Sequence, residues 1–132
     1  MRYYVRRRDP DDPQSAVALY RNYITQQGVV FRQELVEGVE NIQFLYGEDG
    51  NADGAADSYA SADGVANWRN VVSVQLAVLV RTNEEFGLDE EQRQNVQGLE
   101  SFDMLGHTFN IPEDSRFQRE LFSATVNLRN SL

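Results

Sequence analysis

VVSVQLAVLVR, residues 71–81, has the clearest strand pattern in this chain. Every second position is apolar, as in a β-strand that turns one face toward a hydrophobic core. The apolar face consists of Val72, Val74, Leu76, Val78 and Val80, and the mixed face of Ser73, Gln75, Ala77, Leu79 and Arg81. We therefore predict a central strand whose valine-rich face lies in the core.

The same alternation returns near the C-terminus, in residues 121–128. Its apolar positions are Phe122, Ala124, Val126 and Leu128. Because the two segments share a period of two, we expect their apolar faces to meet in one common core.

Other strands are expected on both sides of this central pair. They occupy residues 2–8, 16–24, 41–47 and one or two short pieces of 102–111. The first two should form a hairpin around a turn that contains two prolines. Residues 34–40 fit either a short helical turn or a bent strand, because Gly38 weakens a helix.

Two long segments, residues 48–67 and 83–100, are expected to be mostly loops, which often carry binding residues on a rigid sheet. Many strands with little helix indicate an α+β, β-rich fold built on an antiparallel sheet. The length of 132 residues corresponds to a single domain over 1–132.

The composition narrows the classes of function. The formal net charge is −9, the chain has no cysteine, and all twelve basic residues are arginine. Such an acidic chain repels nucleic-acid backbones and anionic lipids, so we expect no nucleic-acid partner. The basic run at residues 6–8 is interpreted as strand positions neutralised by three nearby aspartates, Asp9, Asp11 and Asp12.

No residue pattern in the chain indicates an enzyme. The absence of Lys and Cys excludes Schiff-base and thiolate chemistry. His107 is the only histidine and is interpreted as a surface or strand-end residue. Nucleophile motifs, phosphate-binding glycine loops and His/Cys metal clusters do not occur in the sequence. We therefore expect no catalytic residues.

An acidic segment punctuated by glycines, DGNADGAAD, occupies residues 49–57. Oxygen-bearing residues at alternate positions suit a loop that wraps around Ca²⁺, with Gly54 at the sharp turn. The bidentate glutamate of such loops is missing, because Ala60 stands there and Asp63 or Glu48 would have to substitute. The expected metal ligands are Asp49, Asn51, Asp53, the carbonyl of Ala55, and Asp57. Binding should be weak, with a Kd of about 10⁻⁴–10⁻³ M. The alternative interpretation is a solvated turn, and no cofactor other than calcium is expected.

A family resemblance runs along nearly the whole chain. It rests on the order of residues 34–43, Tyr46-Gly47, the acidic loop, Trp68 and residues 70–81. The opening Tyr3-Tyr4-Val5, residues 18–21 and the ending FSATVNLRN, residues 122–130, add to it. This series resembles the minor pilin PilW family of bacterial type IV pili. The J-type pseudopilins of type II secretion share a weaker version of the pattern.

The resemblance implies a pilin-like fold, in which a long N-terminal helix packs on an antiparallel sheet. The basic leader, the prepilin-peptidase cleavage site and the apolar helix of that pattern are not found in these residues. We therefore expect a soluble headgroup fragment that lacks the long N-terminal helix. By resemblance, the native protein belongs to the inner membrane, the periplasm and the pilus of a Gram-negative bacterium, with membrane contact only through that helix.

The resemblance also implies a structural role in assembling and priming a pilus near its tip, in support of adhesion and motility. The implied partners are other minor pilins, the major pilin and a tip adhesin, and residues 48–67 and 83–100 are the candidate contact surfaces. Two alternatives remain open. One is a J-type pseudopilin of type II secretion, and the other is a free-standing, calcium-dependent extracellular binding module.

Overall fold

A computed structural model describes residues 1–83, 101–112, 115 and 117–128. The described strands are β1 (Arg2–Arg7), β2 (Val17–Ile24), β3 (Val30–Glu37), β4 (Val39–Glu48), β5 (Ser58–Ala60), β6 (Val71–Arg81), β7 (Ser101–Met104), β8 (His107–Asn110) and β9 (Arg119–Asn127). Helix within the described residues is limited to two 3₁₀ turns, η1 (Ala62–Gly64) and η2 (Trp68–Asn70). The β-rich part of the α+β expectation is confirmed, whereas its helical part is not seen in these residues.

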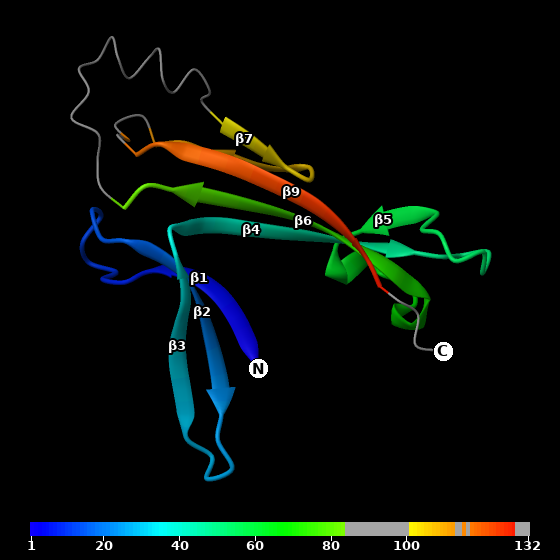
Figure 1. The fold of residues 1–132 in the computed structure, drawn as a ribbon, viewed down its shortest axis with the longest axis horizontal. Coiled ribbons are helices and arrows are strands. Elements are labelled where there is room, and N and C mark those ends of the chain that lie inside the picture. Colours follow the sequence, from blue (N-terminus) through cyan, green and yellow to red (C-terminus); the bar gives the residue numbers. More distant parts are fainter. Residues whose placement is uncertain (84–100, 113–114, 116, 129–132) are drawn as a thin grey trace.

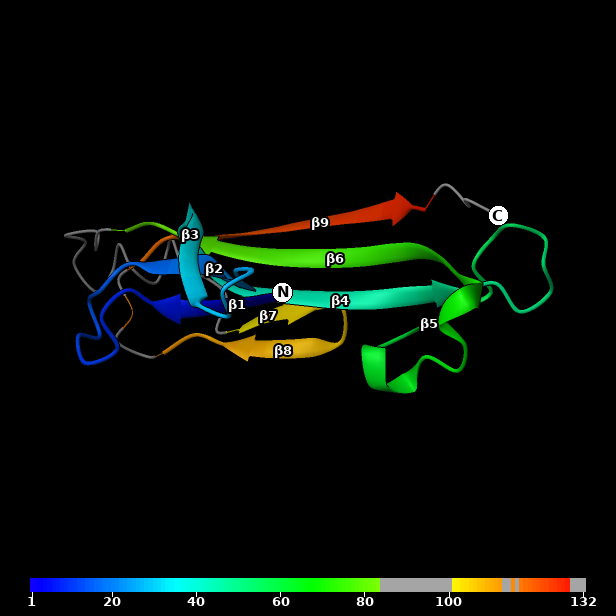
Figure 2. The same cartoon turned by 90° about the horizontal axis from the view of Figure 1, so that it is seen from below.

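The strands form three antiparallel sheets. Their orders are β1-β2-β3, β5-β4-β6-β9 and β7-β8. The three-stranded sheet extends away from one side of the four-stranded sheet, and the β7–β8 hairpin lies on its other side (Figure 1). The same three parts are seen from below in Figure 2, with β6 between β4 and β9.

Most of the expected strands are present. The hairpin of β1 and β2, the strand within residues 41–47, the short pieces of 102–111 and the closing strand are all confirmed. The expected long loop at 48–67 additionally contains β5 and both 3₁₀ turns. The loop expected at 83–100 lies outside the described residues, apart from Asn83.

The segment at 34–40 is a bent strand rather than a helical turn. β3 ends at Glu37 and β4 begins at Val39, with Gly38 between them at a φ of +89°. This left-handed conformation favours glycine. A Cβ atom at Gly38 would also lie 3.1 Å from the backbone oxygen of Arg81. Gly38 therefore sets the corner between the two larger sheets.

The main core lies on the face of β6 opposite to the expected one. Ala77 and Leu79 are almost completely buried against Met104 of the β7–β8 hairpin. Phe102, Leu105, Phe109 and Leu121 pack around them. The expectation that the valine-rich face forms the core is therefore wrong for the described residues, because the hairpin covers the mixed face.

The two apolar faces nevertheless lie on the same side of the four-stranded sheet, although the main core is not there. β6 pairs with β9 so that Val74 lies opposite Val126 and Val78 opposite Phe122. β4 adds Phe44 opposite Leu76. We call this surface the apolar face, and it consists of Ile42, Phe44, Tyr46, Val74, Leu76, Val78, Phe122, Ala124 and Val126. It is half-exposed, because Phe122 and Val126 retain 52% and 47% of their accessible surface.

Candidate functional site

The apolar face is a candidate for a contact with another protein. Its exposed aromatic side chains continue onto η2, where the Trp68 ring meets the Tyr46 ring edge-on at 4.9 Å. Phe44 stacks beside Tyr46 at 6.5 Å. Trp68 remains 54% exposed and Phe44 41% exposed. A group of neighbouring apolar side chains that are exposed to solvent is typical of an interaction site.

The acidic loop is built around the carboxylate of Asp49. Asp49 Oδ1 accepts hydrogen bonds from the backbone N–H of Ala52 at 2.7 Å and of Asp53 at 3.2 Å. Asp49 Oδ2 accepts one from the N–H of Gly54 at 2.8 Å. These donors, Gly54 first, lower the pKa of Asp49 below its usual value. The carboxylate therefore holds the turn together as an anion.

The other expected calcium ligands also take part in the loop's own hydrogen bonds. Asn51 Oδ1 accepts from the N–H of Asp53, and Asp53 Oδ1 accepts from the N–H of Ala55. Asp57 Oδ2 accepts from the N–H of Gly50 at 2.7 Å. Among the described residues, no group of three or more His, Cys, Asp or Glu side chains is placed to hold a metal ion.

Glu48, the candidate substitute for the missing bidentate ligand, anchors the far end of the same segment. Its carboxylate accepts from the N–H of Asn67 at 2.7 Å and of Ala66 at 3.1 Å. Asp57 N–H donates to the Glu48 carbonyl, and Asp49 N–H to the carbonyl of Asn70. These bonds fold the acidic loop and the segment up to Asn70, which includes Trp68, back onto the ends of β4 and β6.

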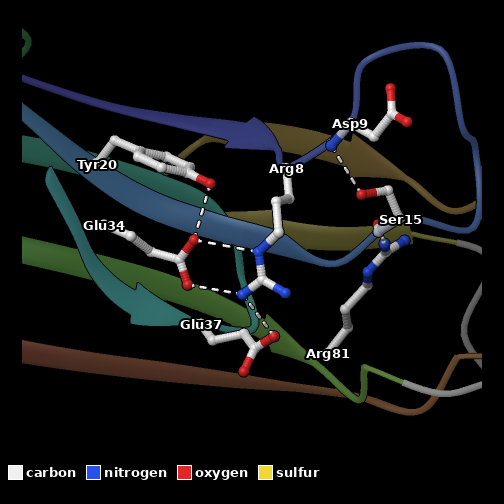
Figure 3. A network of polar contacts seen from close by, with 7 residues as sticks. All are labelled: Arg8, Asp9, Ser15, Tyr20, Glu34, Glu37 and Arg81. Atoms are coloured by element: carbon white, nitrogen blue, oxygen red, sulfur yellow. Dashed lines mark hydrogen bonds and ion pairs between the residues drawn. The ribbon is translucent and has the colours of Figure 1, made fainter. Parts of the chain in front are cut away.

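A second polar network joins β1, β2 and β3, and it contains the last arginine of the basic run (Figure 3). Arg8 donates to both carboxylate oxygens of Glu34, at 2.8 and 3.3 Å, and to Glu37 at 3.0 Å. Tyr20 donates its hydroxyl to Glu34 at 2.9 Å. Arg8 and then Tyr20 lower the pKa of Glu34. The expectation that the neighbouring aspartates neutralise Arg8 is wrong, because its partners come from β3.

A buried ionic cluster ties the strands of the four-stranded sheet to the proline turn. Arg119 donates to both carboxylate oxygens of Glu40, at 2.6 and 3.0 Å. Arg81 lies 3.8 Å from Glu40 and donates to the carbonyl of Ser15 at 2.9 Å. The three side chains are only 3–11% exposed. Burial lowers the pKa of Arg81, while Glu40 opposes that shift.

Sequence reasoning missed this cluster. Its only signal is a charged residue, Arg81, that ends the mixed face of an otherwise apolar strand. Glu40 and Arg119 are far apart in the chain, and only the register of β4, β6 and β9 brings them together. The guanidinium of Arg81 also lies over the ring of Phe117 at 3.9 Å. These contacts make the cluster a structural joint rather than a binding site.

His107 stands exposed as the first residue of β8, which agrees with its interpretation as a strand-end residue.

Among the residues that the structure describes, none forms a helix with the length and hydrophobicity of a membrane span.

Comparison with known proteins identifies the family to which the chain belongs. Residues 2–130 match the family model of type IV pilus-assembly protein W, PilW. No curated protein and no solved structure matches the chain. The matched family is one of pilus-assembly proteins and not a known enzyme family, so an association with the pilus and its other components follows from it. Because the match spans almost every residue, this chain belongs to the PilW family of type IV pilus-assembly proteins.

Proposed function

We propose that this chain is a minor pilin that helps to prime pilus assembly and stays near the tip of the pilus. It acts through protein contacts and not through catalysis. The observation that carries the proposal is the apolar face. One face of the sheet is buried and the other is half-exposed, and exposed apolar surface of this kind commonly marks a contact with another protein. Family membership makes that partner a component of the pilus.

The partner chemistry follows from the surface. The apolar face presents aromatic and branched aliphatic side chains and no charged residue. We propose that an apolar helix packs on it, in the manner of a pilin-like fold. Further contacts, made by the loop at 48–67, would involve other minor pilins, the major pilin and a tip adhesin, in the inner membrane, the periplasm and the pilus.

The test is piliation in a host strain that lacks its own copy of this protein. The variants Phe44→Glu and Phe122→Glu place a charge on the apolar face at positions that are already 41% and 52% exposed. We expect each to reduce surface pili strongly, because burying an unpaired carboxylate in the contact is costly. Ile24→Glu is the matched control, since Ile24 is 69% exposed on the β2–β3 hairpin.

Normal piliation with both face variants would overturn the proposal. Circular dichroism of the purified variants establishes that each one folds. The same strains address the main alternative, a J-type pseudopilin, since that protein would restore type II secretion and leave pili unchanged. A calcium-dependent binding module, the other alternative, would restore neither process.

A further inference from the structure

The outer edge of β9 is open to another strand. β9 is the last strand of the four-stranded sheet and pairs with β6 on one side only. Figure 2 shows it at the border of that sheet, with no other labelled strand beyond it. Within the part of the chain that the structure describes, no hydrogen bond is made to the backbone of residues 121–127 from the outer side.

The register identifies which backbone groups point outward. Leu128 N–H donates to the carbonyl of Val72 at 2.8 Å, so this residue turns its backbone groups toward β6. Such orientation alternates along an antiparallel strand. Phe122, Ala124 and Val126 are separated from Leu128 by an even number of residues, so their backbone N–H and C=O groups also point toward β6. The N–H and C=O groups that point away belong to Leu121, Ser123, Thr125 and Asn127.

This edge lacks the usual protection against pairing. Exposed edges in natural proteins are commonly blocked by charges, prolines or bulges. Residues 121–128, LFSATVNL, contain no charge and no proline, and the β6–β9 register runs without a bulge from Ser73 to Arg81. By contrast, the edge strand β1 carries three arginines. The outward backbone groups of such an edge bond to water in the single chain, and they match the groups of another extended strand.

We propose that β9 pairs antiparallel with the β9 strand of a second copy of this chain, across a two-fold axis that passes close to Ala124. In this register Ser123 lies opposite the partner's Thr125, and Leu121 opposite the partner's Asn127. Every outward backbone group of residues 121–127 then has a partner. The interface is isologous, because each strand supplies the same residues to the other.

The side chains fit the same register. Phe122 lies opposite the partner's Val126 on the apolar face, and such aromatic–aliphatic pairs stabilise neighbouring strands. Glu120 lies opposite the partner's Leu128, so no like charges meet. The axis is perpendicular to the sheet and keeps corresponding faces on one side. Pairing therefore joins the two apolar faces into one continuous surface, and it leaves that surface open.

The charge of the chain gives this association a characteristic salt dependence. Two copies with a net charge of −9 each repel one another, while the paired strands between residues 121 and 128 carry no charge. Salt screens the repulsion and leaves the backbone hydrogen bonds in place. The dimer should therefore become more stable as ionic strength rises, in contrast to an association held by ion pairs.

Sedimentation velocity of the 132-residue chain, over a range of concentrations and at about 0.05 and 0.5 M NaCl, tests the proposal. We expect a reversible dimer that high salt favours. Thr125→Pro removes one outward N–H and leaves the bonds to β6 intact, so it should sediment as a monomer. Thr125→Ala keeps the N–H and should dimerise as the unchanged chain does.

Amide hydrogen exchange supplies a second readout that does not depend on how well the proline variant folds. Exchange at Ser123, Thr125 and Asn127 should slow as the protein concentration rises. Exchange at Phe122, Ala124 and Val126 should be slow at every concentration. A monomer under all conditions, or a dimer without added protection at the outward amides, would overturn the proposal. Neither result bears on the piliation test.

Discussion

At the scale of single residues, the structure depends on two carboxylates, of which the sequence singled out only one. Glu40 and Asp49 are two of 21 acidic residues. Glu40 binds two guanidinium groups in a buried cluster, whereas Asp49 closes an exposed turn with backbone N–H groups. The sequence could identify the turn, because the Asp/Gly pattern is local. It could not identify the cluster, because the partners meet only after three strands align.

Glu40→Ala should be strongly destabilising. It would leave the guanidiniums of Arg81 and Arg119 buried without this carboxylate, and the loss of one member of a buried ion pair costs about 3–5 kcal/mol. Urea denaturation measures the change. Glu120→Gln, at an exposed position of β9, is the matched control and should shift stability by no more than about 0.5 kcal/mol. Equal midpoints for the two variants would contradict the prediction.

The acidic loop gives a prediction for calcium. Weak Ca²⁺ binding by the five proposed ligands remains our proposal. The ion would have to replace the backbone N–H groups that now donate hydrogen bonds to these carboxylates. Millimolar Ca²⁺ should raise the melting temperature. At a tenfold excess of Ca²⁺ over Kd, the free energy of unfolding should increase by about 1.4 kcal/mol. Mg²⁺ should do less. Asp53→Ala should abolish the rise, and an unchanged melting curve in calcium would reduce the loop to a solvated turn.

The same loop should respond to acid. The pKa of Asp49 is lowered in the folded state. Its contribution is therefore complete above the unfolded pKa of about 4 and is lost as the pH falls through the lower folded value. The protection of the Ala52 and Gly54 amides, taken relative to their intrinsic exchange rates at each pH, should fall in that range. Asp49→Asn, which cannot ionise, should remove the pH dependence of this protection at the two amides.

At the scale of elements, periodicity predicted the strands more reliably than the side of the sheet that is buried. The alternation in residues 71–81 identified β6 and that in 121–128 identified β9, while their pairing and register are seen only in the structure. It favoured the valine-rich face because hydrophobicity was the only criterion available. The buried face was decided by β7 and β8, a short hairpin whose weak pattern gave no sign that Met104 would cover Leu79.

Leu79→Ala and Leu76→Ala distinguish the two faces. Leu79 is fully buried, so the truncation should cost about 2–5 kcal/mol through lost contacts and a cavity. Leu76 lies on the half-exposed apolar face, so the same truncation should cost less in the isolated chain. Chemical denaturation of both variants decides the matter. A larger loss for Leu76→Ala would place the core on the face that the sequence favoured.

At the scale of the whole molecule, the two faces of the four-stranded sheet differ, because one is buried in the core and the other is half-exposed. The β7–β8 hairpin closes one face of the four-stranded sheet, and the Glu40 cluster fixes that sheet to the proline turn. The apolar face is left half-exposed, next to the β1–β3 sheet (Figure 1). Such a surface is consistent with membership in a family of pilus-assembly proteins.

The open face should be detectable before any partner is known. An environment-sensitive dye such as ANS fluoresces on exposed apolar surface, and here it should bind to a fully folded chain. Phe44→Ser and Phe122→Ser should lower the fluorescence, because both rings lie on the apolar face and are 41% and 52% exposed. Gln27→Ser, at an exposed polar position in the turn of the β2–β3 hairpin, should change it little. If all three variants kept the full signal and the native melting temperature, the dye would be reporting another surface. In that case the acidic loop and its neighbours around Trp68 would become the leading contact site.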